Sequence, residues 1–131
     1  GRVSSLSPGK AHFTAMCPRI LSKDGKPSLA LGAPGGTNIN MGVLQTILNV
    51  VDFSMSAQEA VSATRFCATP NVIELTNRTL RGVERELNQG GYVTRRYAAS
   101  YITPILHAIR LQDGKLDGGA DPAGDGMAAA C

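Results

Sequence analysis

The sequence predicts an α+β fold built around an antiparallel sheet. Two pairs, Asp24-Gly25 and Asp113-Gly114, each separate apolar stretches of strand length. Asp-Gly readily adopts the positive φ angles of a two-residue hairpin turn, so each pair predicts two antiparallel strands. Between the hairpins, apolar residues in the stretch 37–53 recur with the period of an α-helix. The chain has 131 residues, 43% of them hydrophobic and 18% charged, which is typical of one globular domain or part of a larger one.

The N-terminal part of the chain begins without a regular pattern. Residues 1–10 are rich in Ser, Gly and Pro, which predicts a surface segment or linker ahead of a folded part at 11–131. Strands are expected at 19–22 and 28–31, on either side of the first turn. The helix at 37–53 has a wide apolar stripe, so we expect it to be largely buried.

A second helix and a third strand are expected next. Ser56 followed by Glu59 is the pattern of a capping box, in which each side chain meets a free backbone amide at the start of a helix. This pattern predicts a short helix at 57–63. A strand is expected at 71–76, where the residues are mostly apolar or β-branched.

A third helix should follow, with Thr76 or Asn77 as its cap and Gly90-Gly91 as its end. The residues of its expected apolar face are Leu80, Val83 and Leu87.

The C-terminal part is expected to return to strands. One is predicted at 92–97, and the second hairpin is predicted to join 102–112 to a strand that starts at 115–116. The segment 118–131 is rich in Gly, Ala and Asp, which predicts a loop and a frayed end.

Composition and charge favour neither a nucleic-acid partner nor a metal site. The net charge is +3, from 13 Lys and Arg against 10 Asp and Glu, and the basic residues form no continuous stripe. The cysteines and histidines are few and widely spaced: Cys17, Cys67, Cys131, His12 and His107. We therefore expect free thiols, no metal and no other cofactor. No apolar run in the sequence reaches the roughly 18 residues of a membrane span.

The most informative stretch is the Gly-rich segment 31–38, between an expected strand and the expected buried helix. Such a loop concentrates backbone N–H groups at a helix N-terminus. A phosphate-binding loop would need Lys after the second glycine, but Thr37 follows Gly36. An alternative is an oxyanion hole, in which the N–H groups of Gly35 and Gly36 stabilise the oxygen that becomes negative as an amide carbonyl turns tetrahedral. The loop alone is equally consistent with a structural turn.

Several short motifs occur in a fixed order along the chain. They are Met16-Cys17-Pro18, Lys23-Asp24-Gly25-Lys26-Pro27, Gly32-Ala33-Pro34-Gly35-Gly36, Val43-Leu44-Gln45, Ile47-Leu48-Asn49-Val50-Val51-Asp52, Gln58-Glu59-Ala60-Val61, Arg65-Phe66 and Gly119-Ala120-Asp121-Pro122. In order and spacing they resemble the small subunit of gamma-glutamyltranspeptidases. Each motif is weak alone, but together they extend from about Gly9 to the end. The chain is therefore identified as the C-terminal part of such a small subunit.

The resemblance implies part of an αββα sandwich of the N-terminal nucleophile hydrolase type, with antiparallel sheets. It also implies a precursor that cuts itself into a large and a small subunit, with an N-terminal Thr as nucleophile and its own α-amino group as base. That Thr is expected upstream of this chain. The large subunit and the upstream part of the small subunit are the expected partners.

The activity that the resemblance implies is hydrolysis or acyl transfer on a small-molecule amide. Gly35 and Gly36 are then the oxyanion hole. Thr14, Ala15 and Pro34 are then at the substrate. Most of the family is periplasmic or extracellular, and the sequence leaves the compartment open.

Four positions depart from the family's pattern. Thr14-Ala15 stands where the family has Ser-Ser, which holds the carboxylate of the gamma-glutamyl group, so one hydroxyl is absent. Cys67 replaces a His, and Ala123 replaces an Arg. These changes favour a relative that acts on another amide, as the cephalosporin acylases do.

Two other interpretations remain open. The chain can be a non-catalytic relic or binding module that kept the fold and lost the chemistry. Alternatively, Cys17 or Cys67 is a nucleophile with His12 or His107 as its base, although no feature of the sequence brings a histidine to either cysteine.

Asp121 and Asp125 also resemble a carboxylate pair for acid-base catalysis. Two Asp residues in a Gly-rich segment are more often part of a turn, and a turn is what we expect here.

Overall fold

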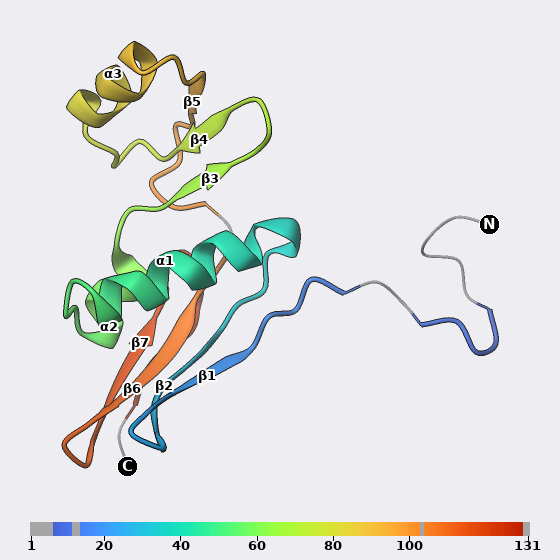
Figure 1. The fold of residues 1–131 in the computed structure, drawn as a ribbon, viewed down its shortest axis with the longest axis vertical. Helices are drawn as coiled ribbons and strands as arrows, with labels where there is room; N and C mark the ends of the chain where they lie inside the picture. Colours follow the sequence, from blue (N-terminus) through green and yellow to red (C-terminus); the bar gives the residue numbers. More distant parts are fainter. Residues whose placement is uncertain (1–6, 12–13, 103, 130–131) are drawn as a thin grey trace.

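The computed structural model describes residues 7–11, 14–102 and 104–129. In chain order the elements are β1 (Arg19–Lys23), β2 (Lys26–Gly32), the 3-10 helix η1 (Gly36–Asn38), α1 (Ile39–Val51), α2 (Ala57–Ser62), β3 (Phe66–Ala68), β4 (Ile73–Leu75), α3 (Arg81–Gln89), β5 (Thr94–Arg96), β6 (His107–Gln112) and β7 (Lys115–Ala120). The strands form two separate sheets (Figure 1). The chain is therefore α+β, as expected.

The larger sheet has the strand order β1-β2-β6-β7, and each neighbouring pair is antiparallel. Both expected hairpins are confirmed. At the first turn Asp24 and Gly25 have φ angles of 52° and 75°, and Asp113 and Gly114 repeat these values at the second. Pairing of β2 with β6 joins the two hairpins into one sheet.

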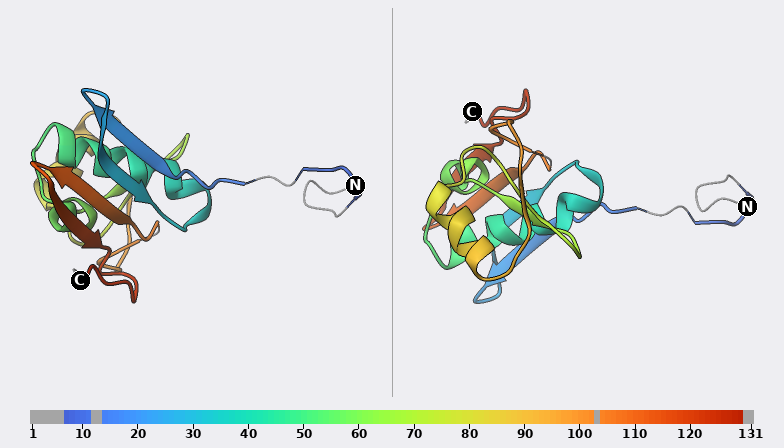
Figure 2. Two further views of the ribbon diagram at one scale, coloured as in Figure 1. Left: turned by 90° about the horizontal axis from the view of Figure 1, so that it is seen from below. Right: turned by 90° about the horizontal axis from the view of Figure 1, so that it is seen from above.

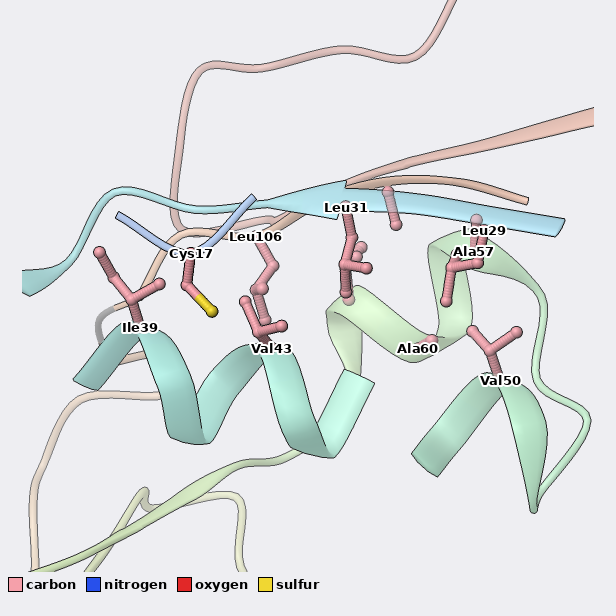
Figure 3. Close-up of a cluster of buried hydrophobic side chains, with 11 residues drawn as sticks. Cys17, Leu29, Leu31, Ile39, Val43, Val50, Ala57, Ala60 and Leu106 are labelled. Carbon is pink, nitrogen blue, oxygen red and sulfur yellow. The ribbon is translucent and has the colours of Figure 1, made fainter. Parts of the chain in front are cut away.

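Helices α1 and α2 cover one face of this sheet (Figures 1 and 2). Figure 3 shows side chains of β2 and of the chain before β6 meeting those of α1 and α2. The buried cluster consists of Cys17, Leu29, Leu31, Ile39, Val43, Val50, Ala57, Ala60, Val61, Leu106 and Ala108. It is the hydrophobic core between the helical layer and the sheet.

The expectation that α1 is largely buried is correct for one face only. Leu44, Leu48 and Val51 point away from the sheet and are 48%, 40% and 59% exposed. The apolar stripe is wider than the sheet can cover, because a single layer contacts only one side of a helix. On this outer side β3 contacts α1 at Gln45, but no described element buries Leu44, Leu48 or Val51.

Helix α2 begins with the expected capping box. The Ser56 N–H donates to Glu59 Oε2 at 2.8 Å, and the Glu59 N–H donates to Ser56 Oγ at 3.2 Å. The N–H of Ala57 donates to Asp117 Oδ2 on β7 at 2.7 Å. The first turn of α2 is thus fixed both by its own cap and by the sheet.

The smaller sheet has the order β3-β4-β5. Strand β3 was not expected from the sequence. Strands β3 and β4 are antiparallel, whereas β4 and β5 are parallel, because α3 carries the chain back to the starting edge between them. The Gln45 side chain attaches this sheet to α1: its Nε2 donates to Phe66 O at 2.9 Å, and the Phe66 N–H donates to its Oε1 at 3.1 Å.

The expected cap of α3 is wrong. Leu80 occupies the cap position and makes no side-chain hydrogen bond to the helix. The hydroxyl of Thr76 pairs with Thr64, and the amide of Asn77 donates to the Ala98 carbonyl, so both side chains are engaged elsewhere. As expected, the helix ends at Gly90, and the following Gly91 has a φ of 86°.

The expected apolar face of α3 is only weakly covered. Leu80 and Val83 are 74% and 43% exposed, and Leu87 is half-buried. The helix is held instead by Arg96, whose guanidinium donates to Glu84 Oε2 at 2.6 Å and to the carbonyls of Thr76, Asn77 and Thr79.

The larger sheet has a second face, opposite the helices. The strand register places Ile20, Ala30, Ile109 and Gly118 in one row across it, and Leu111 beside Leu116 in the next. Ile20 and Leu116 are 71% and 75% exposed. Ala128 lies against Gly118 on this apolar face, which we call the open face, and no helix or sheet covers it among the residues described.

The tail prediction needs one correction. Residues 118–120 belong to β7 rather than to a loop, because they pair with β6. Turns follow from Asp121 to Asp125. In the described residues, none of the helices has the length and apolarity that a membrane span requires.

Candidate functional site

The Gly-rich loop connects the end of β2 to the start of the helical layer. Gly35 has φ 145° and ψ 17°, and Gly36 has a φ of 62°. Both conformations are less accessible to residues with a side chain, so these positions favour glycine. Gly36 is the first residue of η1, which leads into α1 without a break.

The N–H groups of Gly35 and Gly36 lie at the N-terminal end of this helical run. Within the described part of the chain, neither donates a hydrogen bond. The first N–H groups of a helix have no partner inside it and carry partial positive charge. Two adjacent amides are therefore available for an acceptor that carries negative charge.

The segment before β6 lies against the back of the loop. Pro104 is buried, and a Cβ placed on Gly35 would lie 2.6 Å from its Cα. The N–H of Ile105 donates to the carbonyl of Pro34 at 3.1 Å. Pro34 is exposed, and its carbonyl points to the N–H of Ile105.

A buried ion pair supports this segment in turn. Arg65 Nη2 lies 2.5 Å from Asp121 Oδ2, and the two side chains are 4% and 0% exposed. Arg65 also donates to the carbonyl of Pro104 at 3.2 Å. The sequence motifs contained both residues, but the expected role of Asp121 was a turn. Asp121 does form that turn, since its Oδ1 accepts the Ala123 N–H at 2.9 Å, but it is also the buried partner of Arg65.

Asp121 and Asp125 do not form a catalytic pair. The carboxylate of Asp121 is fully occupied by Arg65 and by the N–H groups of Leu106 and Ala123. Asp125 is exposed.

Thr14 and Ala15 enter the fold at the same end of α1 as the loop. Figure 3 shows that Cys17, two residues further on, points at the first turns of α1 beside Ile39. Ala15 is half-buried and packs against the same core cluster. Thr14 is exposed, and its Oγ1 accepts the N–H of Met16 at 3.1 Å.

Cys67 lies at the side of the loop. Its Sγ donates to Asn38 Oδ1 in η1 at 3.1 Å. Burial, together with the nearby charge of Glu74, raises the pKa of the Cys67 thiol. A neutral thiol is a poor nucleophile, so this environment disfavours the cysteine interpretation.

The histidines do not supply a base for either cysteine within the described structure. His107 is exposed at the start of β6, in the larger sheet, whereas Cys67 lies on β3 in the smaller one. Cys17 is in the apolar core. His12 lies outside the described residues.

Comparison with known proteins gives consistent matches over nearly the whole chain. The family model described as Gamma-glutamyltranspeptidase matches residues 2–131. The Acylase ACY 1 proenzyme of Pseudomonas sp. (strain SE83) is 37% identical over 127 residues, covering 96% of this chain and 22% of that protein. The Glutathione hydrolase proenzyme of Pseudomonas aeruginosa is 30% identical over 129 residues, covering 95% of this chain and 23% of that protein.

Among solved structures, a gamma-glutamyltranspeptidase from Pseudomonas nitroreducens complexed with L-DON superposes with a TM-score of 0.83 at 30% sequence identity. The match covers 97% of this chain and 67% of that chain. The chain thus spans between a fifth and a quarter of the length of the two proenzymes, and the similarity in fold extends over nearly all of its residues.

Proposed function

Because this chain belongs to the gamma-glutamyltranspeptidase family, we propose that it is part of an amide-cleaving hydrolase or acyltransferase and supplies the oxyanion hole of that enzyme. The observation that carries the proposal is the pair of N–H groups at Gly35 and Gly36, at the start of η1, which donate no hydrogen bond to any described residue. Such a pair matches the charge that develops on a carbonyl oxygen during acyl transfer.

The proposed reaction proceeds through an acyl-enzyme. An N-terminal Thr outside this chain attacks the carbonyl carbon of the substrate, and its hydroxyl proton passes to its own α-amino group. The carbonyl oxygen becomes negative and accepts hydrogen bonds from Gly35 and Gly36. The C–N bond then breaks, the proton goes to the leaving amine, and water or an acceptor amine releases the acyl group. The large subunit and the upstream part of the small subunit are the proposed partners.

The proposed substrate is an amide other than an ordinary gamma-glutamyl compound. Ala15 offers no hydroxyl for a substrate carboxylate and packs against the core cluster instead. Thr14 keeps a hydroxyl, which already accepts the N–H of Met16. A hydrogen bond to a charged group contributes about 1.5–3 kcal/mol, so its loss should lower selectivity for glutamyl donors by roughly 10- to 150-fold. The 37% identity to an acylase proenzyme supports this choice of substrate class.

Two arms of one experiment test these proposals in the complete two-chain protein. Values of kcat/KM are measured for a gamma-glutamyl anilide and for acyl anilides that lack the α-carboxylate. We expect a preference for the second group, shifted toward the glutamyl compound by Ala15→Ser. A strong glutamyl preference that Ala15→Ser does not change would refute the substrate proposal alone.

The second candidate function, a non-catalytic relic, gives a different outcome. In that case neither class of anilide is turned over, and N-terminal sequencing of the chains finds no free Thr, Ser or Cys. Turnover of either class excludes the relic.

A further inference from the structure

We infer that Arg65 and Asp121 are positioning residues that aim the Gly35 N–H, acting through the segment 104–106. The inference rests on the proposed oxyanion hole. Within the described residues, neither side chain makes a hydrogen bond to Gly35, Thr14 or Pro34, so their effect on the reaction is transmitted by the backbone between them and the loop.

The first step is the attachment of the segment to the ion pair. Arg65 Nη2 donates to the Pro104 carbonyl at 3.2 Å while it also pairs with Asp121 Oδ2 at 2.5 Å. The same Oδ2 accepts the N–H of Leu106 at 3.1 Å, and the Asp121 N–H donates to the Leu106 carbonyl at 2.8 Å. Residues on both sides of Ile105 are therefore fixed to one buried pair.

The second step is the attachment of the loop to this segment. The N–H of Ile105 donates to the Pro34 carbonyl at 3.1 Å. The Cα and Cβ of Pro104 fill the space that a side chain at Gly35 would need, and its ring fills that space at Gly42 on α1. The loop is thus bonded and packed to the segment at adjacent residues.

The third step follows from the geometry of the peptide bond. The Pro34 carbonyl and the Gly35 N–H belong to the same peptide unit, and in a planar trans peptide the two point in opposite directions. Because the Pro34 carbonyl points to the N–H of Ile105, the N–H of Gly35 points away from the segment 104–106. A shift of the segment 104–106 rotates this peptide and turns the donor away from the reacting oxygen.

A second ion pair in the chain provides a matched control. Arg96 pairs with Glu84 at 2.6 Å and, like Arg65, donates to backbone carbonyls, in this case those of Thr76, Asn77 and Thr79. This pair holds α3, and within the described residues it makes no hydrogen bond to the loop or to the segment 104–106.

The test compares Arg65→Lys and Asp121→Asn with Arg96→Lys and Glu84→Gln, all in the complete two-chain protein. For Arg65→Lys and Asp121→Asn we expect kcat to fall by roughly 10- to 100-fold, with KM within about threefold of wild type. The reason is that misplacement of a catalytic group by about 1 Å lowers the rate by up to about 100-fold. A tetrahedral boronate analogue of the acyl group should lose affinity by the same factor as kcat. The control variants should lower the melting temperature and leave kcat within about twofold.

Pro104→Gly keeps the test decisive if the charge variants fail to fold. It retains the carbonyl that Arg65 needs but removes the Cβ that packs against Gly35 and the ring that packs against Gly42. We expect the same fall in kcat and in boronate affinity. The inference is overturned if folded Arg65→Lys or Pro104→Gly retains wild-type kcat, or if the control variants reduce kcat equally. Absence of turnover in the wild-type protein would instead refute the proposed function.

Discussion

Gly35 and Gly36 are adjacent in the chain, but they exclude a side chain for different reasons. At Gly35 a Cβ would collide with the backbone of Pro104, and the φ of 145° adds strain. At Gly36 a Cβ would have no heavy atom within 4 Å, so only the φ of 62° opposes it. Substitution at Gly36 is therefore the cleaner test, because it alters the backbone without disturbing the packing.

The first prediction concerns Gly36→Ala. An L-residue in this left-handed conformation costs about 1–2 kcal/mol, and relaxation of the strain turns the N–H away from its present direction. Complete loss of an oxyanion donor costs about 100- to 1000-fold in rate, so we expect kcat of the complete enzyme to fall at least about tenfold.

Gly25→Ala is the control for this prediction. Gly25 has a φ of 75°, and a Cβ placed on it would also have no heavy atom within 4 Å, but it lies in the hairpin turn between β1 and β2. It should lose similar stability in thermal unfolding while kcat is unchanged. Full turnover by Gly36→Ala would show that its N–H takes no part in the reaction.

The second prediction concerns Cys67→Ser. A serine hydroxyl can still donate to Asn38 Oδ1, and the raised pKa keeps the native thiol neutral near pH 7, so the thiol is not needed as a nucleophile. We expect kcat to stay within about threefold of wild type, because the bond beside the loop is preserved. A loss of activity comparable to that from removing a nucleophile would restore the cysteine interpretation.

At this scale the sequence predicts local chemistry well and distant contacts poorly. The glycines of the loop, the Ser56 capping box and both turn pairs depend on residues a few positions apart. The partner of Asp121 is 56 residues away, so the buried pair follows only from the tertiary fold. Asp-Pro within a Gly-rich segment predicts the turn that Asp121 also makes, and nothing local distinguishes the two roles.

Among the elements, the hairpins and α1 were predictable because each has a strong internal pattern. Strand β3 was not, since its three residues, Phe66–Ala68, are too few to show a period. Its place is set by the Gln45 side chain and by pairing with β4. The start of β6 at His107 rather than 102 has a similar cause, because residues 104–106 bond to the loop and to Asp121 rather than to a strand.

The third prediction concerns α3, which is held by charge rather than by burial. Hydrogen bonding from Arg96 is the main cause that lowers the pKa of Glu84 below its ordinary value of 4.5. A lowered folded-state pKa means that Glu84 stabilises α3 fully above pH 4.5 and progressively less as the pH falls through the lowered pKa. The protection of amides 81–89 against hydrogen exchange should therefore decrease below that pH.

Glu84→Gln should reduce this protection at pH 7 and abolish most of its pH dependence. Glu86→Gln, at an exposed position of the same helix, should change neither. If wild-type protection of α3 is the same at pH 7 and at pH 3, the ion pair does not hold the helix.

At the scale of the whole molecule, the larger sheet and the helices on it form one sheet layer and one helical layer, which is half of an αββα sandwich. The family resemblance predicted that architecture, and the structural match to a gamma-glutamyltranspeptidase confirms the fold. We expect the second sheet of such a sandwich to lie on the open face. The residues of the open face could not be identified from the sequence alone. Side chains along β6 and β7 alternate between the two faces of the sheet, but the sequence does not show which face the helices cover.

The last prediction is that the open face is covered by another sheet in the complete protein. Leu116 is 75% exposed here, and burial of a leucine side chain contributes about 1.5–3 kcal/mol. Residues 1–131 alone should therefore self-associate, bind a hydrophobic dye and fail to unfold cooperatively as a monomer.

Leu116→Lys should weaken that self-association in the isolated chain. In the complete protein it should block assembly with the other chain, because the lysine charge would be buried without a partner. Leu80→Lys is the matched control, since Leu80 is 74% exposed at the start of α3, away from the open face, and should alter neither property. Analytical ultracentrifugation of the isolated chain and the yield of assembled enzyme measure the two effects. Wild-type assembly of the Leu116→Lys protein would show that this face stays in solvent, and the sandwich would then have to be completed elsewhere.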